Sequence, residues 1–287
     1  MTPVPAGIVT PVLTAVPGMH APWERAGDVD ALLRVAQCAD RVGIDHLTCS
    51  EHVAVPTQVA QVRGGTYWDP LASLSYLAGA TSRIRLLTYV LVLGYAHPLA
   101  VAKRYGTLDR LSQGRVVLGL GVGSLREEFD LLGASYDDRG HRADDALRAL
   151  RAGLTDAVPA YRGRHYAFDE MVLEPRPMQE RVPLWIGGQG GRSLRRAVEL
   201  GDGWAPFGLR PSAAAELLGE HDLPAGFEVV LPVGPLDPLG EAPSAGERIE
   251  RAQQAGATRV TVSLRSESPE HYCDQLQALA ELPQVRA

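Results

Sequence analysis

Lysine is almost absent from this chain of 287 residues: Lys103 is the only one, and arginine supplies the remaining positive charge. Acidic side chains outnumber basic ones and leave a net charge of -6 at pH 7. This balance argues against a nucleic-acid partner and against an anionic membrane surface, because both require a basic face. The shortage of lysine itself is typical of a GC-rich coding sequence.

Cysteine is scarce and long apolar runs are missing. Cys38, Cys49 and Cys273 show no CxxC spacing and cannot all pair, so we expect a protein of the reducing cytoplasm. No apolar run approaches the roughly 20 residues that a membrane helix needs, and the first residues lack the pattern of a signal peptide. No His/Cys/Asp cluster has the spacing of metal ligands and no G-x-S-x-G elbow occurs, so no metal is expected.

The most informative stretch that is present runs from Ile84 to Ser124. Its first part, Ile84–Leu93, is aliphatic with almost no polar residue, as in a strand that is covered on both faces. Pro98 suits the first turn of a helix, and Gly114 suits its end. Arg115–Leu120 then predicts a second strand, which must run parallel to the first because a helix crosses between them.

The same alternation recurs along the chain and predicts eight strands, at residues 7–13, 44–50, 84–93, 115–120, 184–188, 204–207, 227–233 and 258–264. Helices are predicted between them, one of which follows an S-x-x-E capping box at 244–247. Residues 155–182 break the rhythm and are interpreted as a surface insertion. The pattern predicts a (β/α)8 TIM barrel, an α/β fold with one domain over residues 1–287. A doubly wound open sheet is the structural rival, and the absence of an early GxGxxG favours the barrel.

The active site of such a barrel is built from the loops that follow the strands. Glu51 and His52 follow the second strand, where His52 could move a proton near neutral pH under the influence of the carboxylate. The alternative is a histidine that caps the next segment. Because neighbouring side chains diverge in an extended segment, Glu51 and His52 are not expected to face the pocket together. His97, just before Pro98, is interpreted as structural.

Two glycine-rich loops lie on the same predicted face. The GGQGGRS segment after the fifth strand is the better anion site, because glycines expose successive N–H groups and a helix N-terminus follows. Ser193 could add a contact there, and the alternative is a tight turn without a ligand. Gly119, Gly121 and Gly123 do not have dinucleotide-binding spacing, and we interpret them as clearance for a flat ring or its linker.

Five motifs carry a family resemblance: RVGIDHLTCSEH, YWDPLASLSYLAGATSRIRL, HPLAVAKRYGTLDRLSQGRVVLGLGVGS, EEFDLLG and LWIGGQGGRSLRRAVELGDGW. On these motifs the chain resembles the bacterial luciferase-like superfamily, in particular its branch of oxidoreductases that depend on the deazaflavin coenzyme F420. The resemblance is close over residues 7–204 and looser beyond. It implies a TIM barrel that binds flavin or deazaflavin across its C-terminal mouth, and members often form homodimers.

The resemblance also assigns site residues. The family's acidic residue and histidine fall on Glu51 and His52, close to the reactive carbon of the ring. The family's bulge in the third strand, often with a non-proline cis peptide, falls on Tyr89 and Val90. The remaining cofactor contacts fall on Gly121, Val122, Gly123 and Ser124, and on the phosphate loop Gly188, Gln189, Gly190 and Gly191.

Two departures from the family pattern bear on the substrate. Tyr89 is larger than the residue common at its position, so it would narrow the pocket or turn away. Members that oxidise sugar phosphates carry a glutamate where this chain has Ser124, which argues against such a substrate.

The leading expectation is an F420-dependent oxidoreductase that transfers a hydride between the cofactor and a small organic substrate. One alternative is an FMN-dependent monooxygenase that uses O2, with a partner reductase supplying the reduced cofactor. The other is a flavin-binding relative without catalysis, against which the intact pair of Glu51 and His52 argues.

Overall fold

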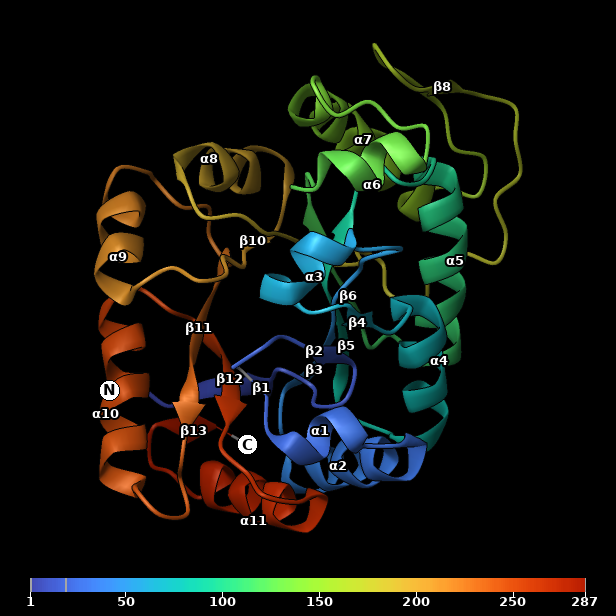
Figure 1. Cartoon of the computed structure of the whole chain (residues 1–287). Helices are drawn as coiled ribbons and strands as arrows, with labels where there is room; N and C mark the ends of the chain where they lie inside the picture. Colours follow the sequence, from blue (N-terminus) through green and yellow to red (C-terminus); the bar gives the residue numbers. More distant parts are fainter. Residues whose placement is uncertain (1, 19, 287) are drawn as a thin grey trace.

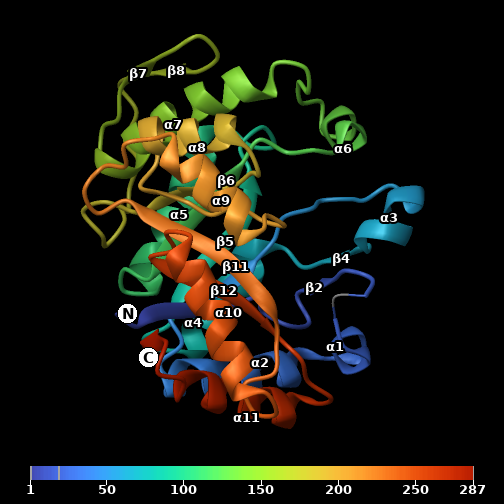
Figure 2. The same ribbon diagram turned by 90° about the vertical axis from the view of Figure 1, so that its left-hand side faces the viewer.

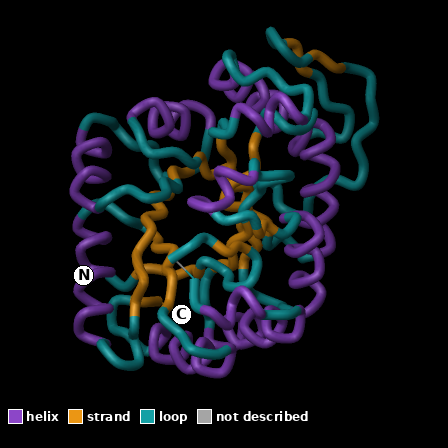
Figure 3. The backbone as a smooth tube through the Cα atoms, viewed as in Figure 1, coloured by secondary structure: helices purple, strands orange, loops and turns teal. Residues whose placement is uncertain are grey.

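Eight parallel strands close into a barrel inside a ring of helices in the computed structural model, which describes residues 2–18 and 20–286 (Figures 1 and 3). The predicted TIM barrel is therefore confirmed. β1 pairs with both β3 and β12, and this double pairing closes the sheet. The barrel strands are β1 (Val4–Ile8), β3 (His46–Cys49), β5 (Arg85–Val92), β6 (Val116–Gly121), β9 (Leu184–Ile186), β10 (Gly203–Trp204), β11 (Glu228–Leu236) and β12 (Arg259–Leu264).

The outer helices begin where the sequence offers capping residues and first-turn prolines. Asp28 accepts a hydrogen bond from the N–H of Ala31, and Ser268 accepts one from the N–H of His271, so each satisfies a free donor of its helix. The helix predicted to start at Ser244 begins earlier, which places that residue inside it. The outer helices are α2 (Val29–Val42), α4 (Pro70–Ala80), α5 (Pro98–Leu111), α7 (Arg139–Thr155), α8 (Gly191–Leu200), α9 (Pro211–Gly219), α10 (Ala242–Gln254) and α11 (Pro269–Ala280).

Smaller elements gather at one end of the barrel, as Figure 2 shows. They are α1 (Pro22–Ala26), α3 (Thr57–Arg63), α6 (Arg126–Leu131) and the antiparallel pair of β2 (Thr14–Ala15) and β4 (Thr66–Tyr67). Between α7 and β9 the chain forms a small hairpin of β7 (Tyr161–Arg162) and β8 (Ala167–Phe168), and β13 (Val285–Arg286) pairs with β1. Over residues 2–18 and 20–286, no helix is both long and apolar enough to cross a membrane.

Two hydrophobic cores hold the barrel. The larger one fills the layer between the strands and the outer helices. The smaller one fills the barrel interior and consists of Leu87, Val117, Trp185, Ala205 and Val230, with Tyr89 packed against it. Because these side chains close the barrel axis, a ligand can enter only from an end.

Candidate active site

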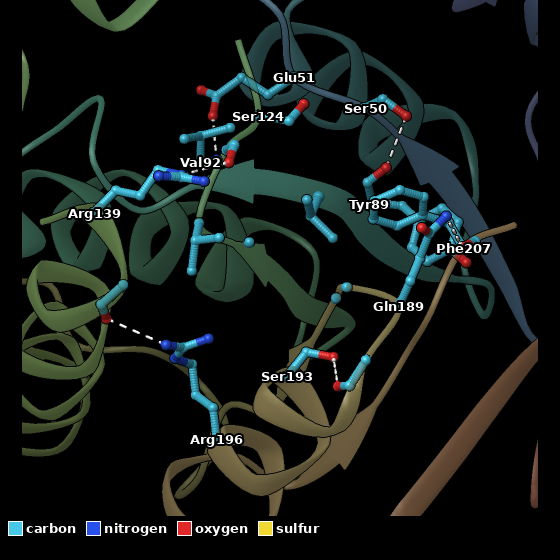
Figure 4. A pocket seen from close by; sticks show the side chains of 18 of the residues that line it. Ser50, Glu51, Tyr89, Val92, Ser124, Arg139, Gln189, Ser193, Arg196 and Phe207 are labelled. Carbon is cyan, nitrogen blue, oxygen red and sulfur yellow. Dashed lines mark hydrogen bonds between the residues drawn. The ribbon is translucent and has the colours of Figure 1, made fainter. Parts of the chain in front are cut away.

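A cavity of 1170 Å³ opens at the carboxyl ends of the barrel strands. It exceeds the range of about 300–1,000 Å³ that is usual for a single small-molecule ligand. Every site residue assigned from the sequence lines it, and Figure 4 shows several of them around the opening. These residues are Glu51, His52, Tyr89, Val90, Gly121, Val122, Gly123, Ser124, Gly188, Gln189, Gly190 and Gly191.

The back wall of the cavity is a bulge in β5. The Tyr89–Val90 peptide is cis, as expected, and the register with β6 shifts between Thr88 and Leu91. The loop after β3 holds the bulge, because the Ser50 hydroxyl donates to the Tyr89 carbonyl at 2.8 Å (Figure 4).

Tyr89 lines the cavity and turns its ring toward the barrel interior. Its ring packs against the interior core, and its hydroxyl donates to the carbonyl of Pro206 at 2.8 Å. Burial raises the pKa of this phenol, so it stays protonated and keeps its bond. The Tyr89 ring is therefore held between the barrel interior and the cavity.

Glu51 forms hydrogen bonds to the bulge at Val90 and Val92. Its carboxylate accepts a hydrogen bond of 2.6 Å from the N–H of Val92, and its own N–H donates to the Val90 carbonyl at 3.3 Å. Burial raises the pKa of Glu51 to about 7, and repulsion from Asp69 and Glu128 acts in the same direction. Glu51 can therefore hold or release a proton near neutral pH.

His52 turns to a different partner, the buried carboxylate of Glu128 on α6. Its Nδ1 lies 2.8 Å from Oε2 of Glu128, and its ring meets Tyr67 edge-on with centroids 4.5 Å apart. Both Glu51 and His52 thus line the cavity, contrary to expectation, although their polar ends point to different partners.

The Glu128 carboxylate accepts several further hydrogen bonds. Tyr95 donates its hydroxyl proton at 2.6 Å, and the N–H groups of Val53 and Ala54 donate at 2.5 and 3.2 Å. Burial opposes ionisation, yet the bonds from Tyr95, His52 and Val53 outweigh it and hold the pKa of Glu128 below its usual value.

The negative charge of Glu128 fixes which ring nitrogen of His52 carries the proton. An ionised carboxylate only accepts hydrogen bonds, so Nδ1 of His52 must carry the proton that lies between them. In the neutral imidazole, Nε2 is then left as an acceptor for a ligand, and Glu128 stabilises the positive charge when Nε2 takes a proton. Glu128 belongs to the EEFDLLG motif, and nothing in the sequence connects it with His52.

The glycines at the end of β6 allow close packing of protein atoms, and their predicted role as clearance for a ring stays a prediction. A Cβ on Gly119 would lie 2.0 Å from the carbonyl oxygen of Thr88. A Cβ on Gly121 would lie 2.6 Å from a methyl group of Val90, and one on Gly123 would lie 2.5 Å from the ring of Phe129. Protein atoms therefore occupy the space that these glycines leave, while the backbone of Gly121 and Gly123 still lines the cavity.

The loop before α8 differs, because it leaves space open. Gly190 is the N-cap of this ten-residue helix, and a Cβ built on it would meet nothing within 4 Å. Ser193 is used by the fold: its hydroxyl donates to the Gly190 carbonyl at 2.7 Å and accepts from the indole of Trp204 at 3.1 Å. The exposed N–H groups of the loop, and not the Ser193 hydroxyl, are thus free to receive an anion.

Arginines line the cavity at several places. Arg139 stacks on Tyr136 at 3.8 Å and donates to the Gly123 carbonyl, while Arg63 donates to the Ser124 hydroxyl at 2.9 Å. Arg192, Arg195 and Arg196 on α8 also line the cavity. Near α8 the lining is therefore of mixed charge, because Arg196 is paired with Asp144 and Glu199 also lines the cavity.

Comparison with known proteins identifies the family. The sequence matches the family described as luciferase-like monooxygenase over residues 7–222, which is most of the chain. The chain belongs to the luciferase-like family. An uncharacterized protein of Mycobacterium tuberculosis is 27% identical over 207 residues, which cover 68% of this chain and 71% of that protein.

Two solved structures share the fold of this chain but differ from each other in the cofactor that they hold. An F420-dependent secondary alcohol dehydrogenase in complex with an F420–acetone adduct superposes with a TM-score of 0.75, 18% identity and full coverage of both chains. The oxygenating component of 3,6-diketocamphane monooxygenase from Pseudomonas putida, in complex with FMN, gives 0.72 and 14% identity, with 99% of each chain covered. The likeness shows a shared fold and leaves the choice of cofactor open.

Proposed function

We propose that this luciferase-like protein is an F420-dependent oxidoreductase that transfers a hydride between the cofactor and a small organic substrate. The observation that carries the proposal is the pairing of His52 with Glu128 inside the cavity. Interconversion of an alcohol and a carbonyl compound moves a hydride at carbon and a proton at oxygen. Because the cofactor takes or gives only the hydride, a separate acid or base must move the proton. His52, held in one tautomer, supplies that group.

The residues of the cavity fit a ring with a phosphate-bearing side chain. The open space at Gly190 and the N-terminus of α8 suit the phosphate, with Gly188, Gln189 and Gly191 around it. The ring would lie against Tyr89 and Val90 and the backbone of Gly121, Val122, Gly123 and Ser124. When bound, the deazaflavin supplies the hydride chemistry.

Side chains of the protein then transfer the protons. Nε2 of His52 accepts or returns the proton of the substrate oxygen, while the Glu128 carboxylate stabilises the imidazolium. Glu51, with a pKa near 7, offers a second proton close to the bulge. The arginines beside α8 suit the acidic tail of F420, which FMN lacks.

The second candidate is an FMN-dependent monooxygenase that takes reduced flavin from a partner reductase and uses O2. The description of the family and the FMN complex of the Pseudomonas putida neighbour favour it. The same residues would hold the ring and phosphate of FMN. The two candidates differ in chemistry, because deazaflavin transfers a hydride and does not activate oxygen.

Binding separates the candidates. We would titrate the purified protein with F420, reduced F420 and FMN in separate calorimetric experiments. The proposal expects F420 or its reduced form to bind in the micromolar range or tighter and FMN to bind at least tenfold more weakly. Tight binding of FMN alone would overturn the proposal.

The role of His52 is tested by turnover on a panel of alcohols and carbonyl compounds with bound F420. His52→Ala should reduce turnover by about 100-fold or more, in the range of general acid–base catalysis, without weakening F420 binding. Unchanged turnover with an unchanged pH profile would exclude His52 as the proton carrier.

A further inference from the structure

Two of the three cysteines face one another across the packed helices α2 and α11. The Sγ of Cys38 lies 3.8 Å from the carbonyl oxygen of Cys273, and the Sγ of Cys273 lies 4.0 Å from the carbonyl oxygen of Arg34. One turn before the cysteines, Arg34 forms an ion pair with Glu270. The two helices are therefore in register, with a salt bridge and a thiol pair as successive contacts.

The environment of the pair favours oxidation. The neighbouring Cys273 side chain, with help from Arg41, lowers the pKa of Cys38 against the effect of burial. Cys38 is 4% exposed and Cys273 is half-buried, so a small oxidant reaches the pair from the side of Cys273. A thiolate beside a second thiol is the arrangement that leads to a disulfide.

The third cysteine has the opposite environment and serves as an internal control. Cys49 is buried in β3, donates to the Trp68 carbonyl at 3.6 Å, and has its pKa raised to about 12 by burial. It should stay reduced under conditions that oxidise the pair.

The pair also lies at the seam of the barrel. α2 follows the first strand and α11 follows the last, and β1 and β12 close the sheet between them. A bond between Cys38 and Cys273 would join residues 235 positions apart. A cross-link over so long a loop restricts the unfolded chain strongly.

We propose that Cys38 and Cys273 are a site of oxidative modification, at which a peroxide forms a disulfide that joins the first and last helices of the barrel. The Cys38 thiolate attacks hydrogen peroxide, the O–O bond breaks, and a sulfenic acid and hydroxide form. The Cys273 sulfur then attacks the sulfenic sulfur, so that the S–S bond forms and water leaves. In total two thiols lose two electrons and two protons, and the peroxide becomes two waters.

The test uses the full chain, treated with a small excess of hydrogen peroxide and then with an alkylating reagent under denaturing conditions. Before alkylation, intact mass should fall by about 2 Da because two hydrogens leave. Peptide mapping should join Cys38 to Cys273 and find Cys49 alkylated. The midpoint of thermal unfolding should rise by about 5 °C or more and return after reduction.

Cys38→Ser and Cys273→Ser should each abolish the mass loss and the thermal shift, whereas Cys49→Ser should keep both. Cys49→Ser also keeps the test decisive if one of the other variants folds poorly. The proposal is overturned if the mass is unchanged, if it rises through sulfinic or sulfonic acid formation, or if the cross-link involves Cys49 or a second chain. None of these readings depends on which cofactor the cavity binds.

Discussion

Two glutamates next to the same cavity have opposite environments. Glu51 receives one backbone hydrogen bond and faces other carboxylates, so burial dominates and favours its neutral form. Glu128 receives hydrogen bonds from two side chains and two backbone N–H groups, so its charged form is favoured. The same side chain can therefore carry a proton at one place and anchor a histidine at the other.

Glu51 should make stability depend on pH. Its pKa of about 7 in the folded chain lies above the value of about 4.3 in the unfolded chain. Between these values the folded state binds more protons, so the free energy of unfolding should fall as the pH rises through this window, by roughly 1–2 kcal/mol after allowance for solvent. Glu51→Gln should remove this part of the slope in urea denaturation at pH 5 and pH 8. Glu216→Gln, at an exposed position on α9, should leave the slope intact, and an equal slope in both variants would contradict the assignment.

Glu128 should set the tautomer of His52. In the wild type, nitrogen NMR of labelled histidine should show the proton on Nδ1 of His52. Glu128→Gln should populate the other tautomer, because an amide can also donate to Nδ1, and should lower turnover by about tenfold or more. Tyr95→Phe keeps the carboxylate and should keep the Nδ1–H signal. A signal in Glu128→Gln identical to the wild type would show that Glu128 does not position His52.

This contact could not be predicted from the sequence. His52 and Glu128 are 76 positions apart, on a loop and on a six-residue helix, and no periodicity connects them. The position of Glu51 and His52 on the catalytic face was predictable, because it depends only on the end of a strand in a barrel. Their partners depend on how α6 packs, which is a tertiary property.

At the scale of elements, the predictable ones are those that bury a face. Most barrel strands follow the predicted apolar runs, whereas β1 occupies Val4–Ile8 where residues 7–13 were predicted, and β10 occupies only Gly203–Trp204 where 204–207 was predicted. α1 and α3 were not predicted, and neither buries a single residue, so neither has an apolar stripe to recognise. The glycines show a similar limit: a Cβ on Gly119, inside β6, would meet a carbonyl oxygen, whereas a Cβ on Gly190, before α8, would meet open space.

The start of α8 offers a test of the anion site. Gly190 has φ of -137° and an empty Cβ direction, so Gly190→Leu should fold normally while its side chain fills the space before the helix. Cofactor affinity should fall by about 100-fold, since a clash removes contacts with the phosphate. Gly219→Leu on α9, where a Cβ also meets nothing within 4 Å, should leave affinity unchanged. An equal affinity for both variants would show that the cofactor's phosphate does not bind at this loop.

At the scale of the whole molecule, the two ends of the barrel are built differently. The carboxyl end is open and holds the cavity. The opposite end contains a network in which Asp45 bonds to His46 at 2.8 Å and to Arg259 at 2.6 Å. Arg259 also pairs with Glu228, and Arg85 stacks over the interior Trp185. Asp45 lies just before β3, whereas Glu228 and Arg259 begin β11 and β12. These ion pairs therefore link the start of the chain to its end, and they form only when the barrel closes.

This network should contribute to stability without contributing to binding. Against burial, His46, Arg259 and Arg85 hold the pKa of Asp45 well below its usual range, so Asp45 is charged in the folded chain. Asp45→Asn removes the carboxylate that Arg85 and Arg259 share, although Arg259 keeps Glu228, and it should lower the free energy of unfolding by about 3 kcal/mol in urea denaturation. Glu247→Gln, which breaks an exposed pair on α10, should cost less than about 0.5 kcal/mol.

Cofactor affinity should stay the same in Asp45→Asn, because the network lies at the end of the barrel opposite the cavity. A loss of affinity together with unchanged stability would mean that the network acts on the mouth through the barrel. That result would contradict the division of this molecule into a binding end and a stabilising end.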